Sequence, residues 1–260
     1  MVRRSMCRFL AYCGEPVFLE TLVCTPCHSL IEQSMHAAEA KTETNGDGFG
    51  VGWYSERTEP GRYCEIRPAW SDENLQSICS HVRSHLFFAH VRAATGTAVS
   101  RANCHPFKAG RFLFMHNGQV GDWPRLRRKV EAMIPDELYS ARTGTTDSEA
   151  IFLAALGQGL ERDSVGAFQR VLHAIRDEMR ALGITSPLRF TATWTDGERV
   201  WAVRWASDDK PPSLYWRRGD NGLIVVSEPV DAQRDQWRPV PPGGGLVARI
   251  GAAPEMFTFH

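Results

Sequence analysis

The sequence has no surplus of either charge. Its 30 Lys and Arg residues balance 30 Asp and Glu residues. Domains that bind nucleic acids usually carry a basic patch or stripe, and acidic or disordered solvating segments carry a large net charge. The balance therefore argues against a nucleic-acid partner and against a long disordered tail. At 260 residues, the chain is long enough to bury a sizeable core.

Long hydrophobic runs and a secretory signal are also missing. A helix that spans a bilayer needs about 20 consecutive apolar residues, and no stretch approaches that length. Arg3 and Arg4 could begin an export signal, but such a signal continues with an apolar run of about 7–15 residues. Arg8, Gly14 and Glu15 interrupt any run of that kind. We expect a cytoplasmic protein with no membrane partner.

The seven cysteines are an odd number in a chain of this length, which is not typical of a disulfide framework. Cys24-Thr-Pro-Cys27-His28 has the spacing of covalent haem attachment, but that chemistry needs export. A zinc site needs a second pair of ligands, and Cys64 and Cys79 stand alone in the sequence. We interpret the motif as two loop cysteines before a helix and expect no cofactor and no metal. A haem or metal protein is the alternative, which a featureless visible spectrum would eliminate.

The order of elements is strands, then a helical block, then strands. Period-two patterns and buried apolar runs predict strands at residues 7–12, 49–54, 63–68, 86–91, 111–116, 188–195, 199–206, 213–217, 222–228, 245–250 and 255–259. Helical spacing and start signals predict helices at 28–40, from Ser71 onward, and at 122–133, 147–160 and 164–182. Four glycines between Asn45 and Tyr54 indicate close backbone approach. No linker or repeat interrupts this order, so we expect one layered α+β domain.

Polar residues cluster where buried strands end. The candidates are Arg92, Thr95, His105, Asn117, Gly118 and Asp147. Each has an ordinary alternative: a surface ion pair for Arg92, a loop histidine for His105, a turn at Asn117-Gly118 and a helix N-cap for Asp147. Polar groups gathered at strand ends are, however, typical of a pocket.

The residue types indicate what such a pocket binds. An arginine offers a planar fork for a carboxylate, and an aspartate pairs with an ammonium group. Arg92 and Asp147 together therefore suit the two charged groups of an amino acid. The side-chain amide of Asn117 beside the backbone N–H of Gly118 supplies two donors, as an oxyanion hole requires.

Cys7 is the candidate nucleophile because it follows an internal methionine, Met6. If translation starts at Met6, removal of that methionine leaves Cys7 at the N-terminus. Its own α-amine, with a pKa of about 7.7–8.0, can then act as the base for its thiol. The alternative is an ordinary cysteine buried in a strand.

These residues resemble a known family. The chain resembles the class II glutamine amidotransferase domain, an N-terminal-nucleophile hydrolase, and is most similar to stand-alone members such as those of glutathione degradation and ergothioneine synthesis. The resemblance runs from about residue 6 to residue 250. It rests on Met6-Cys-Arg-Phe-Leu10, Asn45-Gly-Asp-Gly-Phe-Gly-Val-Gly-Trp-Tyr54, Phe88-Ala-His-Val-Arg-Ala-Ala-Thr-Gly96, Asn103-Cys-His-Pro-Phe107, Phe114-Met-His-Asn-Gly118, Thr146-Asp-Ser-Glu149 and Ser227-Glu-Pro229.

The resemblance implies a four-layer αββα sandwich of the N-terminal-nucleophile hydrolase type. It implies that Cys7 attacks a γ-glutamyl amide to form a thioester, which water hydrolyses. The family roles place the substrate α-carboxylate on Arg92 and Thr95, the α-amine on Asp147, the oxyanion on Asn117 and Gly118, and His105 in the pocket.

Two departures from the family pattern bear on these expectations. Residues 1–5 precede Met6, and an acylated Cys7 nitrogen could not act as a base. Our hypothesis is that residues 1–5 are a leader or a mis-assigned start and that residues 6–260 form the single domain. Ala93 also stands where synthase-fused members often carry Trp, which weakens the transfer of fine pocket detail.

We therefore expect a γ-glutamyl amide hydrolase that acts on glutamine or a glutathione-like compound. Because residues beyond 250 leave no room for a synthase domain, the chain is expected to complete the hydrolysis itself or to serve a separate synthase or peptidase partner. The alternative is a non-catalytic γ-glutamyl-binding or regulatory subunit of a larger complex.

Overall fold

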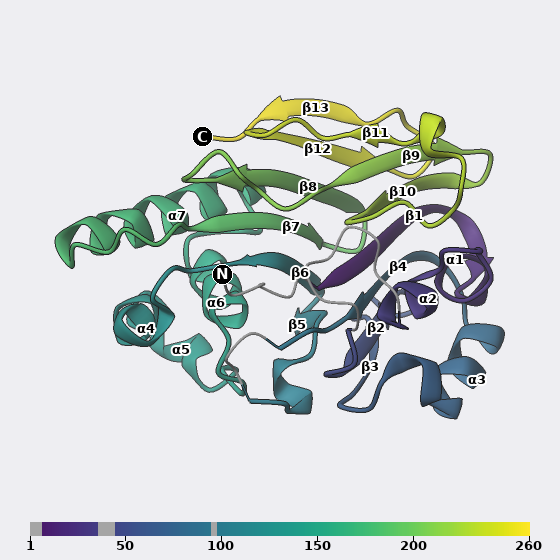
Figure 1. The fold of residues 1–260 in the computed structure, drawn as a ribbon, viewed down its shortest axis with the longest axis horizontal. Coiled ribbons are helices and arrows are strands. Elements are labelled where there is room, and N and C mark those ends of the chain that lie inside the picture. Colours follow the sequence, from purple (N-terminus) through teal and green to yellow (C-terminus); the bar gives the residue numbers. More distant parts are fainter. Residues whose placement is uncertain (1–6, 36–44, 95–97) are drawn as a thin grey trace.

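Two antiparallel sheets form the centre of the structure, a computed structural model that describes residues 7–35, 45–94 and 98–260 (Figure 1). Their strands are β1 (Arg8–Phe18), β2 (Phe49–Trp53), β3 (Gly61–Glu65), β4 (Arg83–Val91), β5 (Phe107–Ala109), β6 (Phe112–Gln119), β7 (Arg189–Thr195), β8 (Arg199–Ala206), β9 (Tyr215–Gly219), β10 (Gly222–Val226), β11 (Arg238–Pro239), β12 (Gly244–Arg249) and β13 (Glu255–Thr258). Within the described residues, one sheet has the order β11-β9-β10-β1-β4-β2-β3, and the other has the order β13-β12-β8-β7-β6-β5.

Helices cover the outer face of each sheet. They are α1 (Glu20–Val23), α2 (Leu30–Met35), α3 (Glu73–His81), α4 (Trp123–Glu131), α5 (Asp136–Tyr139), α6 (Asp147–Gly157) and α7 (Ser164–Ala181). Helices α1–α3 pack on the seven-stranded sheet, and α4, α6 and α7 pack on the six-stranded sheet (Figure 1). The fold is therefore the expected four-layer αββα sandwich of the N-terminal-nucleophile hydrolase type.

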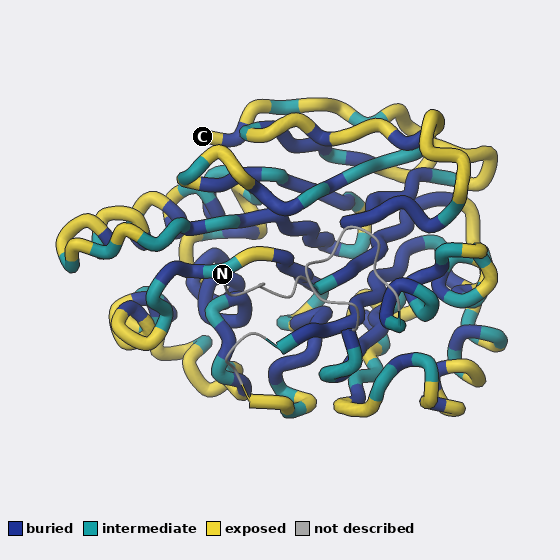
Figure 2. Tube along the Cα trace, viewed as in Figure 1, coloured by how far each residue is buried: buried dark blue, intermediate teal, exposed yellow. Residues whose placement is uncertain are grey.

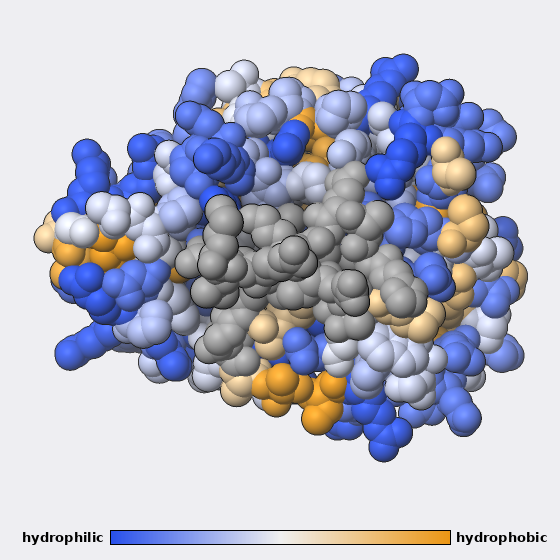
Figure 3. Space-filling view, in the orientation of Figure 1, coloured by the Kyte–Doolittle hydropathy of each residue, from blue (hydrophilic) through white to orange (hydrophobic). Residues whose placement is uncertain are grey.

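Three apolar clusters hold the four layers together. The cluster between the sheets contains Phe9 and Phe88 from one sheet and Leu113 and Met115 from the other. The two outer clusters join each sheet to its helices. The tube in Figure 2 is accordingly buried along the central strands and exposed along the outer turns of the helices. Hydrophilic side chains cover most of the visible face outside the grey residues (Figure 3).

Strand β1 is buried on both faces. Phe9 and Ala11 face the other sheet, whereas Leu10 and Tyr12 face the helices. A strand with two buried faces reads as a continuous apolar run rather than as an alternation. The sequence pattern located its start for this reason but not its end, because β1 continues to Phe18.

The hairpin of β7 and β8 confirms the strongest local prediction. Its register pairs Thr195 with Val200. In the turn, Gly197 has a φ of 91°, and the Asp196 carboxylate accepts hydrogen bonds from the backbone N–H groups of Glu198 and Arg199 at 3.0 and 2.8 Å. Glycine adopts a positive φ without the steric cost that other residues carry.

The predicted helix at 28–40 begins as expected. The hydroxyl of Ser29 accepts a hydrogen bond from the backbone N–H of Glu32 at 3.2 Å. The structure describes this helix as far as Met35, and residues 36–40 of the prediction lie outside the described residues. No helix within 7–35, 45–94 and 98–260 is long and apolar enough to cross a membrane.

Phe114→Ala is expected to lower the free energy of unfolding by about 3–5 kcal/mol, as buried Phe→Ala substitutions do. Phe114 is fully buried, and its ring centroid lies 5.2 Å from that of Phe152 and 5.3 Å from that of Phe168. Urea unfolding measures the loss. Phe18→Ala is the matched control: Phe18 is 44% exposed, and we expect a loss below about 1 kcal/mol. Equal losses would contradict the assignment of the core.

Candidate active site

Cys7 directly precedes β1, the central strand of the seven-stranded sheet. Pairing of Arg8 with Val91 in β4 brings the thiol to the end of β4. There the Cys7 Sγ donates to the carbonyl oxygen of Ala93 at 3.6 Å and accepts from its backbone N–H at 3.5 Å. The backbone of Ala93 thus holds the thiol in place.

The Cys7 thiol is protonated at neutral pH. Burial raises the pKa of the thiol above its ordinary value, and this effect exceeds the opposing effects of the Ala93 hydrogen bond and of the positive charges of Arg92 and Arg8. Because the thiolate is the nucleophile, reaction at this sulfur requires a base that removes the proton.

Arg92 is held by the turn that precedes β2. Its guanidinium donates to the carbonyl oxygens of Asp47 at 3.3 Å and Ala98 at 3.2 Å. The Asp47 carboxylate in turn accepts from the backbone N–H of Ala94 at 2.7 Å. Arg92 is only 3% exposed, so the alternative of a surface ion pair is wrong. Thr95 lies outside the described residues.

The lack of a side chain at Gly50 lets the backbone of His105 lie directly against β2. A Cβ placed on Gly50 would lie 2.2 Å from the carbonyl oxygen of His105 and 2.5 Å from the Cys64 Sγ. Only glycine allows this approach, which confirms the prediction made from the four glycines.

His105 stacks on His90 of β4, with ring centroids 4.3 Å apart. Both rings are buried, and none of their four nitrogens has a hydrogen-bond partner among the described residues. Burial, assisted by the charge of Arg92, lowers the pKa of His90 to about 3 and that of His105 well below its ordinary value. Both imidazoles are therefore neutral at physiological pH, so His105 offers a neutral hydrogen-bonding group rather than a cation.

Asn117 and Gly118 lie in β6 of the opposite sheet, paired with Thr191 and Phe190. They do not form the turn that was the ordinary alternative. The amide Nδ2 of Asn117 is buried without a partner among the described residues, whereas Gly118 is exposed. A Cβ on Gly118 would lie 2.0 Å from the carbonyl oxygen of Arg189, so this position excludes larger residues.

Asp147 is the first residue of α6 and not its N-cap. The cap is Thr146, whose hydroxyl accepts from the backbone N–H of Glu149 at 3.2 Å. The Asp147 carboxylate instead accepts from the backbone N–H groups of Val120 at 2.7 Å and Ser148 at 2.8 Å. These bonds fix it beside the end of β6.

Asn103 links this helix start to the Arg92 segment. Its amide donates to the carbonyl oxygen of Ala98 at 2.8 Å and to the Thr145 hydroxyl at 3.1 Å, and its oxygen accepts from the Thr145 backbone N–H at 2.7 Å. Ala98 is also an acceptor for Arg92. The two charged groups expected to bind an amino acid therefore rest on one connected framework.

The structure links part of the predicted site. Arg92 lies close enough to Cys7 and His105 for its charge to act on the pKa values of both groups, and Asn103 connects the Arg92 segment to the start of α6. Within the described ranges, no hydrogen bond joins Cys7 directly to Asn117 or Asp147.

One buried ion pair next to Cys7 was missed in the sequence. Arg8 and Glu228 are both fully buried, and their Nε and Oε2 atoms are 2.7 Å apart. The other oxygen, Oε1, lies 2.7 Å from Nε2 of His28. A charged residue inside the apolar run of β1 was the available signal, because a buried charge needs a partner. The partner, 220 residues away, had no local signal.

The residues of the haem-like motif, Cys24 to His28, make contacts with other protein groups. His28 bonds to Glu228, and the thiol of Cys24 shares a hydrogen bond with that of Cys79 in α3. No group of three or more candidate metal ligands occurs among the described residues.

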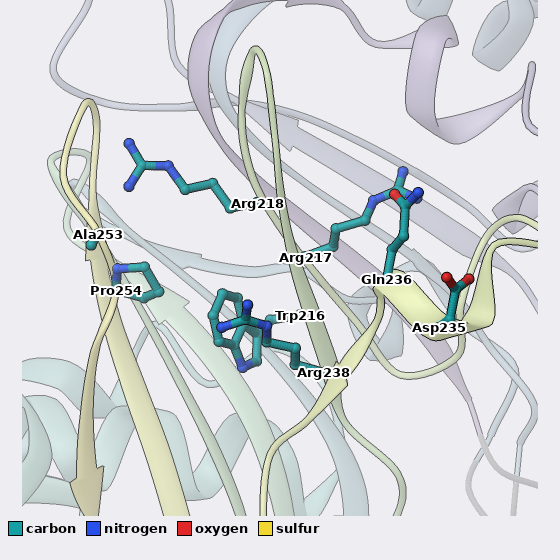
Figure 4. A pocket seen from close by; sticks show the side chains of 8 residues that line it. All are labelled: Trp216, Arg217, Arg218, Asp235, Gln236, Arg238, Ala253 and Pro254. Atoms are coloured by element: carbon teal, nitrogen blue, oxygen red, sulfur yellow. The ribbon is translucent and has the colours of Figure 1, made fainter.

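A separate hollow of about 450 Å³ lies at the edge formed by β9, β11 and the turn before β13 (Figure 4). Arginines and Trp216 from β9 and β11 line one side, and Ala253 and Pro254 line the other. Its lining contains no Cys, Ser, Thr or His residue among the described residues, so the hollow offers no thiol or hydroxyl nucleophile.

The sequence pattern of the class II glutamine amidotransferases matches residues 6–209. The chain belongs to this family. As a class II glutamine amidotransferase, it is an enzyme, and it is 31% identical to the probable glutamine amidotransferase DUG3 of Saccharomyces cerevisiae, over 94% of this chain and 82% of that protein.

Two further similarities extend over nearly the whole amidotransferase chain. The γ-glutamyl-hercynylcysteine sulfoxide hydrolase of Mycolicibacterium smegmatis is 28% identical, over 91% of this chain and 92% of that one. The solved structure of a glutamine aminotransferase class-II domain protein from Silicibacter pomeroyi has a TM-score of 0.77 at 37% identity, covering 97% of this chain and 99% of that chain.

Lowering the pH from 7 to 5 is expected to destabilise the folded enzyme through its buried histidines. Unfolded histidines titrate near pH 6.5, whereas His90 stays neutral down to about pH 3. The unfolded state therefore binds protons first, and the free energy of unfolding falls as the pH drops below 6.5. At pH 5 the loss is about 2 kcal/mol for His90.

Urea unfolding of a His90→Asn variant at pH 7 and pH 5 tests this expectation. The variant should lose less stability on acidification than the parent. His173→Asn, at an exposed position of α7, should behave like the parent. A His90→Asn variant with the parent's full pH dependence would contradict the assignment.

Proposed function

We propose that this class II glutamine amidotransferase hydrolyses the γ-glutamyl amide of glutamine or of a glutathione-like compound, with Cys7 as an N-terminal nucleophile. The position of Cys7 carries the proposal. Its thiol lies at the head of the central strand, held by Ala93 and close enough to Arg92 for that charge to lower its pKa. A half-buried thiol beside an arginine suits attack on a substrate that carries a carboxylate.

The base in this proposal is the α-amine of Cys7 itself. With a pKa of about 7.7–8.0, the free amine accepts the thiol proton, directly or through one water. The domain would then begin at residue 6 or 7, and residues 1–5 would be a leader or a mis-assigned start. The family match, which begins at residue 6, supports this boundary.

In the reaction, Cys7 Sγ attacks the amide carbon and the carbonyl oxygen becomes an oxyanion. The Nδ2 of Asn117, which has no hydrogen-bond partner among the described residues, and the backbone N–H of Gly118 donate to this oxygen. The protonated amine then gives its proton to the leaving nitrogen, the C–N bond breaks and a γ-glutamyl thioester remains. Water, deprotonated by the same amine, hydrolyses the thioester to glutamate and restores the thiol.

The substrate's own charges set its orientation. Arg92 and Thr95 hold the α-carboxylate, Asp147 pairs with the α-ammonium group, and neutral His105 contributes a hydrogen-bonding surface. The anchoring of Asp147 on Val120 and Ser148 supports a fixed carboxylate, which favours a zwitterionic amino acid over a simple amide.

The relatives support this substrate class. One is described as a hydrolase of a γ-glutamyl compound and another as a probable glutamine amidotransferase. We further propose a cytoplasmic enzyme, consistent with seven unpaired cysteines, which acts alone or with a separate synthase or peptidase. A non-catalytic γ-glutamyl-binding subunit is the competing function.

Cys7→Ala, made in protein that begins at residue 7, is expected to abolish glutamate release from glutamine and glutathione while the fold remains intact. The reason is the loss of the attacking sulfur. Glutamate assays measure the loss, and circular dichroism checks the fold. Cys27→Ala, at an exposed cysteine, is the matched control and should keep full activity.

Two outcomes would contradict the proposal. If the parent beginning at Cys7 binds glutamine without turnover, the chain is a binding subunit. If intact-mass analysis finds an active enzyme that still carries Val2–Ser5, the α-amine is not the base, since loss of a general base typically costs about 10²–10⁴-fold in rate.

Asn117→Ala is expected to lower kcat about 10²–10³-fold, as removal of one oxyanion donor does, with little change in KM. The amide acts on charge that develops only in the transition state, which is why KM is spared. Steady-state kinetics with glutamine measure both constants. Asn221→Ala, at the exposed turn between β9 and β10, is the control. An effect on KM alone would reassign Asn117 to ground-state binding.

A further inference from the structure

The segment that follows β10 bonds to successive residues at the start of β1. Ser227 Oγ accepts from the backbone N–H of Phe9 at 3.0 Å, and Ser227 N–H donates to the carbonyl oxygen of Phe9 at 3.1 Å. Glu228 accepts from Arg8 Nε at 2.7 Å. Arg8 in turn donates through Nη1 to the carbonyl oxygen of Cys7 at 3.1 Å. The bonds thus reach the carbonyl of the nucleophile itself.

The carboxylate of Glu228 is itself fixed from a second side. His28 contacts its other oxygen at 2.7 Å. Gln33 of α2 donates to the carbonyl oxygens of His28 at 3.0 Å and Glu228 at 3.4 Å. Arg8 therefore has a rigid anchor, and its guanidinium cannot turn away from the Cys7 carbonyl without breaking the ion pair.

Stability alone gives little reason for this arrangement. Arg8 and Glu228 are both 0% exposed. Taking two charges out of water costs several kcal/mol, and well-packed apolar residues in their place are often as stabilising or more so. The buried guanidinium of Arg8 also donates to the carbonyl oxygen of Cys7. It can therefore orient Cys7, which an apolar pair could not do.

That use follows from the covalent geometry of an N-terminal residue. The α-amine of such a residue has no preceding peptide to hold it. The amine and the Cβ rotate together about the Cα–C bond, so their direction is set once the carbonyl plane and the thiol are both fixed. Arg8 fixes the carbonyl of Cys7, and Ala93 fixes its sulfur.

We infer that Ser227, Glu228 and Arg8 form a positioning unit that orients the α-amine of Cys7 toward its own thiol. The inference rests on the proposed N-terminal mechanism and assigns no substrate contact to the three residues. The unit acts on proton transfer between amine and thiol. Its loss therefore lowers kcat and leaves substrate affinity unchanged.

Kinetics of Glu228→Gln and Ser227→Ala, in protein that begins at Cys7, test the inference with glutamine as substrate. Glu228→Gln removes the charge that anchors Arg8 at nearly constant shape, and Ser227→Ala removes one backbone bond without disturbing a buried charge. We expect kcat to fall about 100-fold for Glu228→Gln, as for a misplacement of roughly 1 Å, and about 10-fold for Ser227→Ala, with KM within about two-fold of the parent.

Glu131→Gln is the matched control, because Glu131 accepts from Arg142 at 2.9 Å in a largely buried pair of the helical layer. It should lose stability with an unchanged kcat. If folded Glu228→Gln keeps the parental kcat, or if only its KM rises, the inference is overturned. If Glu228→Gln does not fold, the same criteria applied to Ser227→Ala decide. A parent that releases no glutamate would instead refute the proposed function.

Discussion

The antiparallel pairing of β1 with β4 on one side and β10 on the other is the interaction on which the site depends. It places Cys7 beside Ala93 at the end of β4, and it places Ser227 and Glu228 beside the first residues of β1. Because β1 is buried on both faces, a shift of one residue would move Phe9 from the inter-sheet core to the helix face. The same register that satisfies the core therefore fixes the proposed nucleophile.

The pKa shifts in the site follow from the burial of its titratable groups. Burial raises the pKa of the Cys7 thiol and lowers the pKa of His90 and His105. Nearby imidazoles are thus poor candidates for a charged role, and the proposed ionic contacts to the substrate fall to Arg92 and Asp147. In a site of low polarity, charges at these positions would act strongly on a substrate that carries the complementary pair.

Much of this arrangement could be read from local sequence. The alternation at residues 199–206 coincided with β8, and the glycines before Tyr54 marked the close approach at Gly50. Helices of four residues such as α1 were not predicted because they offer barely one period of the helical pattern. Glu228, the partner of Arg8, was not predicted for a different reason. It lies 220 residues away, and a pairing at that separation leaves no periodic signal in the sequence. Thr95 falls outside the described residues, so its role stays a prediction.

Cys7 directly precedes a strand of one sheet and Asn117 lies in a strand of the other, and an apolar layer packs between the two sheets. The thickness of that layer consequently sets one distance within the proposed active site. Side chains such as Leu113 and Met115 lie in the core, and their size sets the separation between the proposed nucleophile and the proposed oxyanion donors. Change in this enzyme's activity can therefore arise from substitutions that look purely structural, and the packing of its core is under chemical as well as mechanical constraint.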